Sequence, residues 1–344
     1  APRVILKSIL AAAAEKGFSA YAGAEVEYFL LKRTAAGELV PADDDDTAAQ
    51  PCYDARGVTR MYDHLTSVST AMNQLGWGNY ANDHEDGNGQ FEQNFEYADA
   101  LTTADRVVTL RYLLNVIAAE RGMIATFMPK PFAHRTGSGL HLHLSLRDAA
   151  GERAVFPRGD AEGDGPGLGL SQTAYSFVAG LLDHATALQA VIAPTVNSYK
   201  RTGAVASSAS GATWAPRLPT YGGNDRTHYV RVPDDQRIEL RGGDGSANPY
   251  LAIGAALAAG LDGIERGLGL GALGTGPKTP FPATLLRAVE ALEEDAVLKA
   301  ALDSAVGAGG VDVSSYYARL KREEFFSYHA AVSDWEIQRY LTAF

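Results

Sequence analysis

The sequence predicts an α+β fold in one large domain, and three observations support this class. Segments with a helical spacing of apolar residues are mixed with segments in which polar and apolar residues alternate. Strands return through turns and helices, unlike the regular strand–helix–strand repeat of a parallel α/β fold. No internal repeat and no linker divides the 344 residues.

The first half of the chain is predicted to form three helices and two strands. The helices cover 3–16, 58–75 and 102–121, and each is ended by a glycine. The strands cover 21–33 and 90–96, where side chains of alternate residues face opposite ways. The acidic run at 43–46 is interpreted as a solvated loop, because like charges repel one another.

The second half is predicted to begin with a strand and to end in helices. Its strands are 139–147 and a hairpin over 230–241 with a Pro-Asp turn, and its helices begin near Ser171 and at Asn248. The segment 159–169 is rich in glycine, and 200–228 is a long polar segment. A loop of that length inside a compact domain is usually functional or disordered.

Composition excludes several classes of protein. The net charge is −11 and the pI is about 5.2, and no basic patch is visible, so we expect no nucleic-acid partner. No apolar run approaches the ~20 residues that span a bilayer, and no signal peptide is visible. The single cysteine, Cys52, excludes an internal disulfide, fits a cytoplasmic location and lies in no nucleophile motif.

Motif searches are mostly negative. The chain lacks the GxxxxGK[ST] phosphate-binding loop, so an ATP site would have to be of another type. A GxGxxG match at Gly269, Gly271 and Gly274 follows a helix instead of a strand, and we interpret it as a loop. Five histidines without ligand-like spacing are interpreted as ordinary: His64, His134, His184, His228 and His329.

Four predicted strands carry polar residues along one face. An exposed face of an antiparallel sheet would explain any one of them. Together they indicate a polar cavity, and carboxylates so close together would raise one another's pKa values unless cations relieved the repulsion. The stripes are Glu25 and Glu27; Gln90, Glu92, Asn94 and Glu96; His141, His143 and Ser145; and Arg237, Glu239 and Arg241.

The residue types narrow the chemistry. Many carboxylates with one or two histidines and no thiolate suit Mg²⁺ or Mn²⁺ better than zinc. Arginines gather in the same part of the sequence, and a guanidinium binds carboxylates and phosphates. Two cations about 4–6 Å apart beside such arginines suit phosphoryl transfer. The arginines are Arg201, Arg226, Arg231, Arg237 and Arg241.

Five ordered motifs then give a family resemblance. IATFMPKP (124–131), GSGLHLH (137–143), VNSYKR (196–201), RIELR (237–241) and SANPYLA (246–252) together resemble the catalytic domain of glutamine synthetases. The resemblance implies a curved antiparallel β-sheet with flanking helices. It also implies a smaller N-terminal β-grasp domain, which we do not find. We therefore expect residues 1–344 to be the catalytic domain alone, poorly active without that domain.

The resemblance also implies roles for individual residues. One cation would be held by Glu27, Glu85 and Glu92, and the other by Glu25, His141 and Glu239. ATP would meet His143, Arg237 and Ser145, and the transferring phosphoryl group would meet Arg226 and Arg231. Glutamate would be held by Arg201, Arg241 and the backbone of Gly137. The implied reaction phosphorylates the γ-carboxylate of glutamate with ATP, after which an amine displaces phosphate.

Departures from the family pattern bear on the amine. The flap at 202–224 lacks the usual glutamate that binds ammonium, and Ser207 or Ser208 falls near its place. Thr136 and Asp83 replace a usual asparagine and histidine. These changes resemble the γ-glutamylmethylamide synthetase (type III) branch, so we expect a glutamate–methylamine ligase.

Two alternatives remain open: a glutamine synthetase using ammonia, and an inactive relative acting as a binding or regulatory module. The arginines and the motifs of the glutamate pocket argue against a third, a two-metal hydrolase. By analogy with the family we expect a homo-oligomeric ring, a dodecamer.

Overall fold

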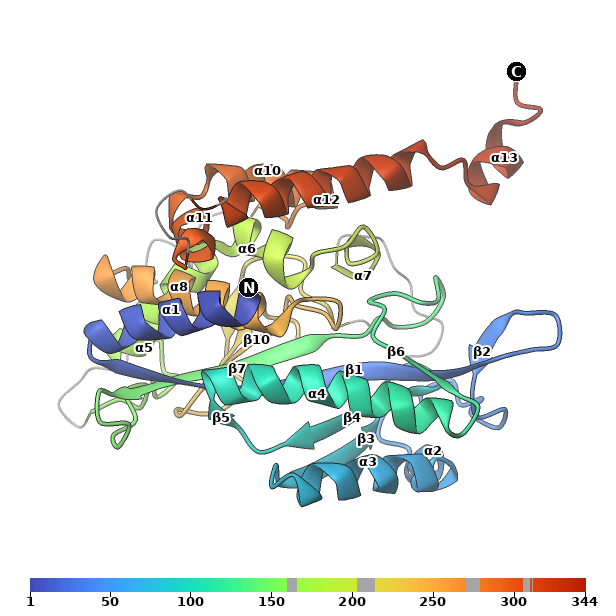
Figure 1. Cartoon of the computed structure of the whole chain (residues 1–344), viewed down its shortest axis with the longest axis horizontal. Helices are drawn as coiled ribbons and strands as arrows, with labels where there is room; N and C mark the ends of the chain where they lie inside the picture. Colours follow the sequence, from blue (N-terminus) through green and yellow to red (C-terminus); the bar gives the residue numbers. More distant parts are fainter. Residues whose placement is uncertain (160–165, 203–213, 270–278, 306–309, 311) are drawn as a thin grey trace.

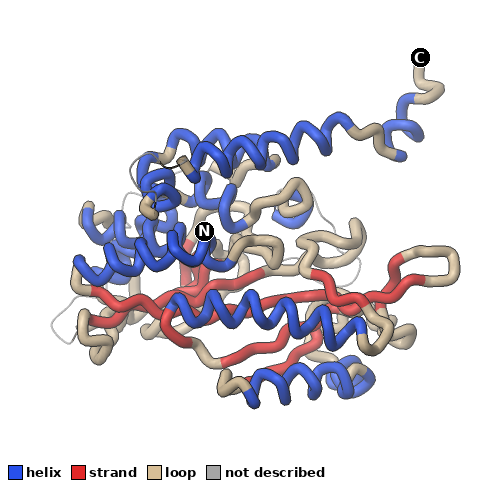
Figure 2. The backbone as a smooth tube through the Cα atoms, viewed as in Figure 1, coloured by secondary structure: helices blue, strands red, loops and turns tan. Residues whose placement is uncertain are grey.

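The computed structural model describes residues 1–159, 166–202, 214–269, 279–305, 310 and 312–344, in which ten strands form one sheet (Figure 2). The order is β3–β4–β1–β7–β10–β9–β8, and β2, β5 and β6 also pair with β1. All pairs are antiparallel except β8 with β9. The strands are β1 (Phe18–Arg33), β2 (Leu39–Pro41), β3 (Asn79–His84), β4 (Gln90–Phe95), β5 (Ala98–Asp99), β6 (Ile124–Thr126), β7 (Leu140–Asp148), β8 (Tyr221–Gly222), β9 (Val230–Arg231) and β10 (Ile238–Leu240).

Helices flank this sheet: α2 and α3 lie beside β3 and β4, and α4, which packs against β1, also contacts α3 and α8 (Figure 1). No helix among the described residues is long and apolar enough to cross a membrane. The helices are α1 (Pro2–Glu15), α2 (Ala55–Arg60), α3 (Tyr62–Gln74), α4 (Ala100–Ala119), α5 (Gln172–Asp183), α6 (Ala185–Ile192), α7 (Tyr199–Thr202), α8 (Pro249–Glu265), α10 (Leu285–Glu294), α11 (Ala296–Asp303), α12 (Val313–Ala330) and α13 (Asp334–Tyr340).

The predicted α+β class is confirmed, and local signals explain where several elements begin. Ser171 caps α5 by accepting a hydrogen bond from the Ala174 N–H at 3.1 Å, as its hydroxyl favours at a helix start. Asn248 caps α8 in the same way, with Pro249 in the first turn.

Two predictions for the first half were wrong in part. The helix expected over 58–75 is two helices, α2 and α3, which meet at Met61. The acidic run is not wholly solvated, because Asp46 is only 6% exposed. Partners from distant parts of the chain, His84, Asn88 and Gly89, bind its carboxylate. The GxGxxG loop, apart from Gly269, lies outside the described residues, as do Ser207 and Ser208.

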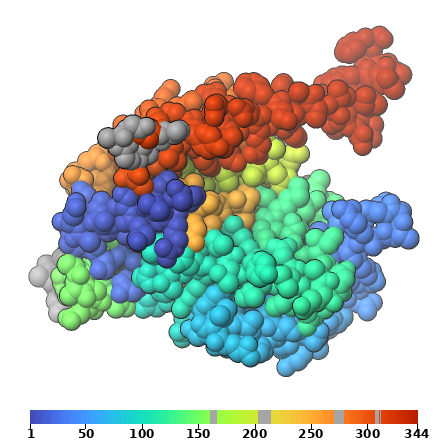
Figure 3. All heavy atoms as spheres, viewed as in Figure 1, coloured from blue at the N-terminus to red at the C-terminus, as the bar shows by residue number. Residues whose placement is uncertain are grey.

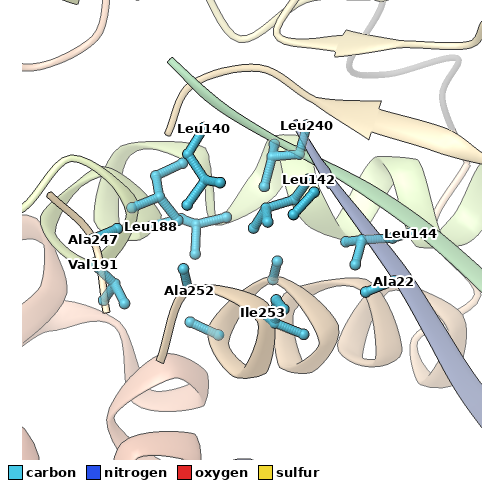
Figure 4. Close-up of a cluster of buried hydrophobic side chains, with 14 of the residues drawn as sticks. Ala22, Leu140, Leu142, Leu144, Leu188, Val191, Leu240, Ala247, Ala252 and Ile253 are labelled. Carbon is cyan, nitrogen blue, oxygen red and sulfur yellow. The ribbon is translucent and has the colours of Figure 1, made fainter. Parts of the chain in front are cut away.

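The apolar face of the sheet packs against α6 and α8 (Figure 4). Leu140, Leu142 and Leu144 of β7 alternate with its histidines and are each about 1% exposed. Ala252 and Ile253 of α8 lie beneath them in Figure 4. Burying a leucine contributes about 1.5–3 kcal/mol relative to leaving it exposed. The period of two that buries the leucines therefore turns the histidines to the opposite face.

Two contacts connect the helices of this layer: the close packing of α5 on α8, and the hydrogen bonds of a buried histidine. A Cβ atom on Gly180 of α5 would lie 2.1 Å from the Ala259 carbonyl of α8, so only glycine fits there. His184, at the end of α5, lies 3.0 Å from an Asp262 oxygen and 2.6 Å from an Asp295 oxygen. His184 thus links α5 to α8 and to the junction between α10 and α11.

Candidate active site

The predicted polar stripes come together on one face of the sheet. The strand register, set by the backbone pairing, places residues far apart in the sequence opposite each other. The opposed pairs are Glu27 with Glu92, Glu25 with His141, and Glu239 with His143. Carboxylates and imidazoles from β1, β4, β7 and β10 therefore form one cluster, here called the carboxylate–imidazole cluster.

Two imidazoles hold the carboxylates of β1. His141 Nδ1 lies 3.1 Å from Glu25 Oε2, and His141 Nε2 lies 3.6 Å from Glu27 Oε1. His143 accepts a hydrogen bond at Nδ1 from Arg237 Nε at 3.1 Å, and its Nε2 lies 2.8 Å from Glu25 Oε1. Because arginine only donates, Nδ1 of His143 carries no proton, and the ring donates from Nε2 to Glu25.

Negative charge is concentrated on the same face. Burial, with the charges of Glu25, Glu85 and Glu27, raises the pKa of Glu92 well above its ordinary value. Burial, Glu27 and Asp86 likewise raise the pKa of Glu85. Burial alone would also raise the pKa of Glu25, but hydrogen bonds from the two histidines outweigh it and hold that pKa well below its ordinary value. A bound cation would relieve the repulsion at Glu85 and Glu92.

Glu239 is fully buried and lies between two guanidinium groups. Arg231 Nη1 donates to its Oε2 at 2.7 Å, and Arg241 Nη1 donates to its Oε1. Arg231 Nε also donates to Asn224 Oδ1 at 3.0 Å, and Arg241 Nε donates to the Arg226 carbonyl at 3.0 Å. These contacts fix both arginines beside the cluster.

An inner pocket lies at one side of the cluster. Among the described residues Arg201 Nη1 is buried there without a hydrogen-bond partner, which indicates an anionic ligand, because a buried unpaired donor is costly. Gly139 allows the close packing, since a Cβ there would lie 2.8 Å from Arg201 Nη2. The pocket is lined by Glu27, Glu85, Asp86, Gln90, Thr136, Gly137, His141, Arg201, Trp214, Ala215 and Arg241.

An outer pocket of about 480 Å³ lies at the other side. The Arg147 guanidinium lies 4.6 Å from the centre of the Tyr21 ring and donates to the Tyr97 hydroxyl at 3.0 Å. The wall of the outer pocket includes Gly23, Glu25, Tyr80, Glu96, Tyr97, His143, Ser145, Arg147 and Arg237. Aromatic and basic groups of this kind suit a flat ligand that carries phosphates.

The two pockets meet at the cluster. Glu25 and His143 line the outer pocket, whereas Glu27 and His141, two residues away on the same strands, line the inner pocket. Ligands in the two pockets would therefore approach each other beside the carboxylates.

Comparison with known proteins agrees with this geometry. The family profile described as "Glutamine synthetase, catalytic domain" matches residues 1–340. The chain belongs to the glutamine synthetase family.

Glutamine synthetase relatives cover nearly the whole chain. The glutamine synthetase of Rhizobium meliloti (strain 1021) is 42% identical over 98% of this chain and 76% of the relative. The glutamate–methylamine ligase of Methyloversatilis universalis is 42% identical over 99% of this chain and 77% of the relative. The solved structure described as "GmaS/ADP complex-Conformation 1" is 47% identical, with a TM-score of 0.88 over 99% of this chain and 77% of that one.

Membership of the glutamine synthetase family makes the chain an ATP-dependent ligase and implies the use of ATP and a divalent metal. The donor set fits such a metal, because carboxylate oxygens with one or two imidazoles suit Mg²⁺ or Mn²⁺. On the sheet face the described residues form two groups whose ligand atoms lie within 4.8 Å of one another: Glu25, Glu92 and His141; and Glu25, His143 and Glu239. The resemblance implied other groupings of the same face, so the partition into two ion sites stays a prediction.

The structure brings the residues predicted for a glutamine synthetase site to the two pockets or beside the cluster. Arg226 lies at the inner side, with its guanidinium 5.8 Å from the Tyr53 ring centre and 5.4 Å from that of Trp214. The individual roles stay predictions. Inner-pocket members of the predicted set are Glu27, Glu85, Gly137, His141, Arg201 and Arg241, and outer-pocket members are Glu25, His143, Ser145 and Arg237.

Sequence reasoning missed several pocket residues. Arg147 continues the stripe of His141, His143 and Ser145, so the same period of two could have found it. Glu96 was left without a role, and it lies exposed at the outer pocket. Tyr97 and Tyr80 carried no signal in the sequence.

Two further findings concern the inner pocket and its surroundings. Trp214 and Ala215, the first described residues after the gap in the flap, line the inner pocket beside Thr136. Burial, with the nearby charges of Glu85 and Asp86, raises the pKa of Cys52 to about 12. A thiol that stays protonated is a poor nucleophile, which agrees with the expectation for Cys52.

Proposed function

We propose that this chain joins glutamate to methylamine using ATP, forming γ-glutamylmethylamide through γ-glutamyl phosphate. The observation that carries the proposal is the meeting of the two pockets at the carboxylate–imidazole cluster. The nucleotide occupies the outer pocket and glutamate occupies the inner pocket. The γ-phosphate and the γ-carboxylate then face each other, as in-line transfer requires.

In the first step a γ-carboxylate oxygen of glutamate attacks the γ-phosphorus of ATP, and ADP leaves. Arg201 and Arg241 hold the glutamate carboxylates. Arg237 binds phosphate oxygens, and His143, which accepts a hydrogen bond from Arg237 Nε, orients that guanidinium. Arg226 and Arg231 neutralise charge that develops on the transferring group. The carboxylates and imidazoles of the cluster would hold divalent cations, which would add positive charge beside the phosphate oxygens.

Glu85 and Asp86 line the inner pocket and provide negative charge for an alkylammonium ion, which loses a first proton to solvent and becomes the neutral amine. In the second step this amine attacks the acyl carbon, the bond to the phosphate oxygen breaks, and the nitrogen loses a second proton, which the released phosphate takes up. The flap sequence at 202–224 has no acidic residue. Small neutral residues there weaken ammonium capture and leave room for a methyl group, which supports methylamine.

Ammonia is the second candidate substrate, which would make the chain a glutamine synthetase. The glutamine synthetase of Rhizobium meliloti is as similar to this chain as the methylamine ligase is, at 42% identity each. Phosphate release with Mg²⁺, ATP and glutamate is measured over a range of methylamine and of ammonia concentrations, with reactions lacking glutamate or amine as controls. A higher kcat/KM for methylamine supports the proposal, and a higher value for ammonia overturns it.

We also propose that the chain forms a homo-oligomer through its last helices. In the space-filling view the end of the chain projects from the body (Figure 3), and α13 buries none of its residues. An exposed apolar surface of this extent usually marks a protein interface. Sedimentation velocity should show an assembly of several chains, and removing residues 331–344 should make it dissociate into smaller species. A full-length chain that sediments as a monomer at micromolar concentration contradicts the proposal. The exposed residues are Phe326, Tyr328, Val332, Trp335, Ile337, Tyr340 and Leu341.

A further inference from the structure

The acidic run 43–46 is divided between two ion pairs and a buried contact. Asp43 accepts a hydrogen bond from Arg60 at 2.5 Å, and Asp44 accepts one from Lys32 at 2.5 Å. Asp45 is exposed, whereas Asp46 is 6% exposed. A charge is seldom buried unless specific partners compensate it, so Asp46 differs from the exposed Asp44 and Asp45.

Asp46 binds two parts of the segment that follows β3. Its Oδ2 lies 2.8 Å from His84 Nε2 and also accepts the backbone N–H of Gly89 at 2.5 Å. Its Oδ1 accepts a hydrogen bond from the Asn88 side-chain amide at 3.2 Å. The carboxylate therefore joins the residue before Glu85 to residues at the far end of the same turn.

The His84 ring passes this constraint to Glu85. The side chain is fully buried, and its Nδ1 lies 2.7 Å from the Glu85 carbonyl oxygen. The ring packs edge-on against Phe91 at 4.9 Å, and a Cβ on Gly57 would lie 2.3 Å from its Cδ2. The imidazole therefore has no room to turn away from either oxygen acceptor.

We propose that Asp46 is a positioning residue for Glu85, acting through His84 and Gly89. These contacts fix both ends of the turn over 85–89, from which Glu85 and Asp86 reach the inner pocket. The inference rests on the proposed function, because it takes Glu85 as a ligand of a divalent cation. Groups that orient metal ligands in this way typically change metal affinity by about 10–100-fold when they are removed.

Asp46→Asn is the direct test, because it keeps the shape but places an NH₂ group against donors. Asp45→Asn, one residue away and exposed, is the matched control. Mn²⁺ binding to the folded chain without substrates is followed by the electron paramagnetic resonance signal of free Mn²⁺. Asp46→Asn should weaken one class of Mn²⁺ site about tenfold or more, and Asp45→Asn should not. Equal Mn²⁺ affinity in both variants overturns the proposal.

Glu85→Gln separates a failure of the inference about Asp46 from a failure of the metal-ligand role assigned to Glu85. Glu85→Gln should weaken the same class of Mn²⁺ site; if it does not, the assigned role of Glu85 and the inference both fail. If Glu85→Gln weakens that site and Asp46→Asn does not, only the inference fails.

His84→Gln covers the case in which Asp46→Asn does not fold. It should weaken the same site, and unchanged Mn²⁺ affinity overturns the proposal. Where both single variants fold, the double variant Asp46→Asn, His84→Gln should bind Mn²⁺ little more weakly than either single variant does. Both changes break the same chain of contacts from Asp46 through His84 to Glu85. Fully additive losses contradict that chain.

Discussion

Replacing Glu239 by glutamine removes a single negative charge from the centre of the site. Glu239 is fully buried and accepts hydrogen bonds from Arg231 and Arg241, and His141 Nδ1 lies 3.6 Å away. Glutamine keeps one acceptor oxygen but presents an NH₂ group to the second guanidinium. Removing one partner of a buried ion pair costs about 3–5 kcal/mol, and the retained acceptor favours the lower end of that range.

The same change should abolish most turnover. In Glu239→Gln, Arg231 is no longer fixed by a carboxylate, and a proposed ligand of one cation loses its charge. We expect the transition state to lose about 3–4 kcal/mol of stabilisation, the lower part of the range for a broken buried ion pair. At about 1.4 kcal/mol per tenfold, Glu239→Gln should turn over about 10²–10³-fold more slowly.

Two measurements test this reasoning: urea unfolding and amine-dependent phosphate release by the folded variant. Glu15→Gln, an exposed carboxylate on α1, is the matched control and should leave both quantities near those of the unchanged chain. Turnover by Glu239→Gln within about threefold of the unchanged chain would refute the assignment.

Four further predictions follow from the structure. His184 is buried, which lowers its pKa, but its hydrogen bonds to Asp295 and Asp262 outweigh this and raise it. Its stabilising effect is therefore full below the unfolded pKa of about 6.5 and is lost as pH rises through the folded pKa. His184→Gln should then lower the unfolding free energy by about 1–3 kcal/mol at pH 6 and by less at pH 9; equal losses at both pH values contradict this. Arg201→Lys should raise the KM for glutamate about 100-fold with a smaller change in kcat, because the planar fork is lost; an unchanged KM refutes the assigned carboxylate contact. Mn²⁺ at about 100 times its Kd should raise the unfolding free energy by about 2.7 kcal/mol, an increase that a chelator reverses; an unchanged melting temperature argues against a folded-state metal site. Gly180→Ala should lower the melting temperature, since its new Cβ would meet the Ala259 carbonyl at 2.1 Å and overpacking costs about 1–3 kcal/mol; unchanged melting would show that α5 and α8 can separate at no cost.

Much of the active face could be predicted from the sequence because backbone geometry sets the period of a strand. His141 and His143 had to share a face with one another and oppose the leucines between them. The register could not be predicted in the same way. Glu25 meets His141 across 116 residues, a contact that depends on how the whole sheet assembles.

Pockets and buried charges were harder to predict, because both depend on tertiary partners. Nothing local distinguishes Asp46 from Asp45, and the hydrogen-bond partners that make its burial favourable, among them His84, lie about 40 residues further along the chain. The outer pocket needs Tyr80 of β3, Tyr97 beyond β4 and Arg147 of β7 to converge. The choice of amine, the cytoplasmic location and the extent of the domain as residues 1–344 all stay predictions.

The long strand β1 has a consequence for how the protein is made. It pairs with β2, β4, β5, β6 and β7. The last residue of the carboxylate–imidazole cluster, Glu239, comes from β10, which pairs with β7. Roughly 200 residues separate Arg33 from Ile238, and at about 5–20 residues per second a ribosome needs about 10–40 s to make them. During the first part of that time β1 has been made while several of its partner strands have not, and the last of them, β7, ends at Asp148. The ligand-bearing face is therefore among the last parts of the sheet to be completed during synthesis, and cations can find the full set of ligands only after that.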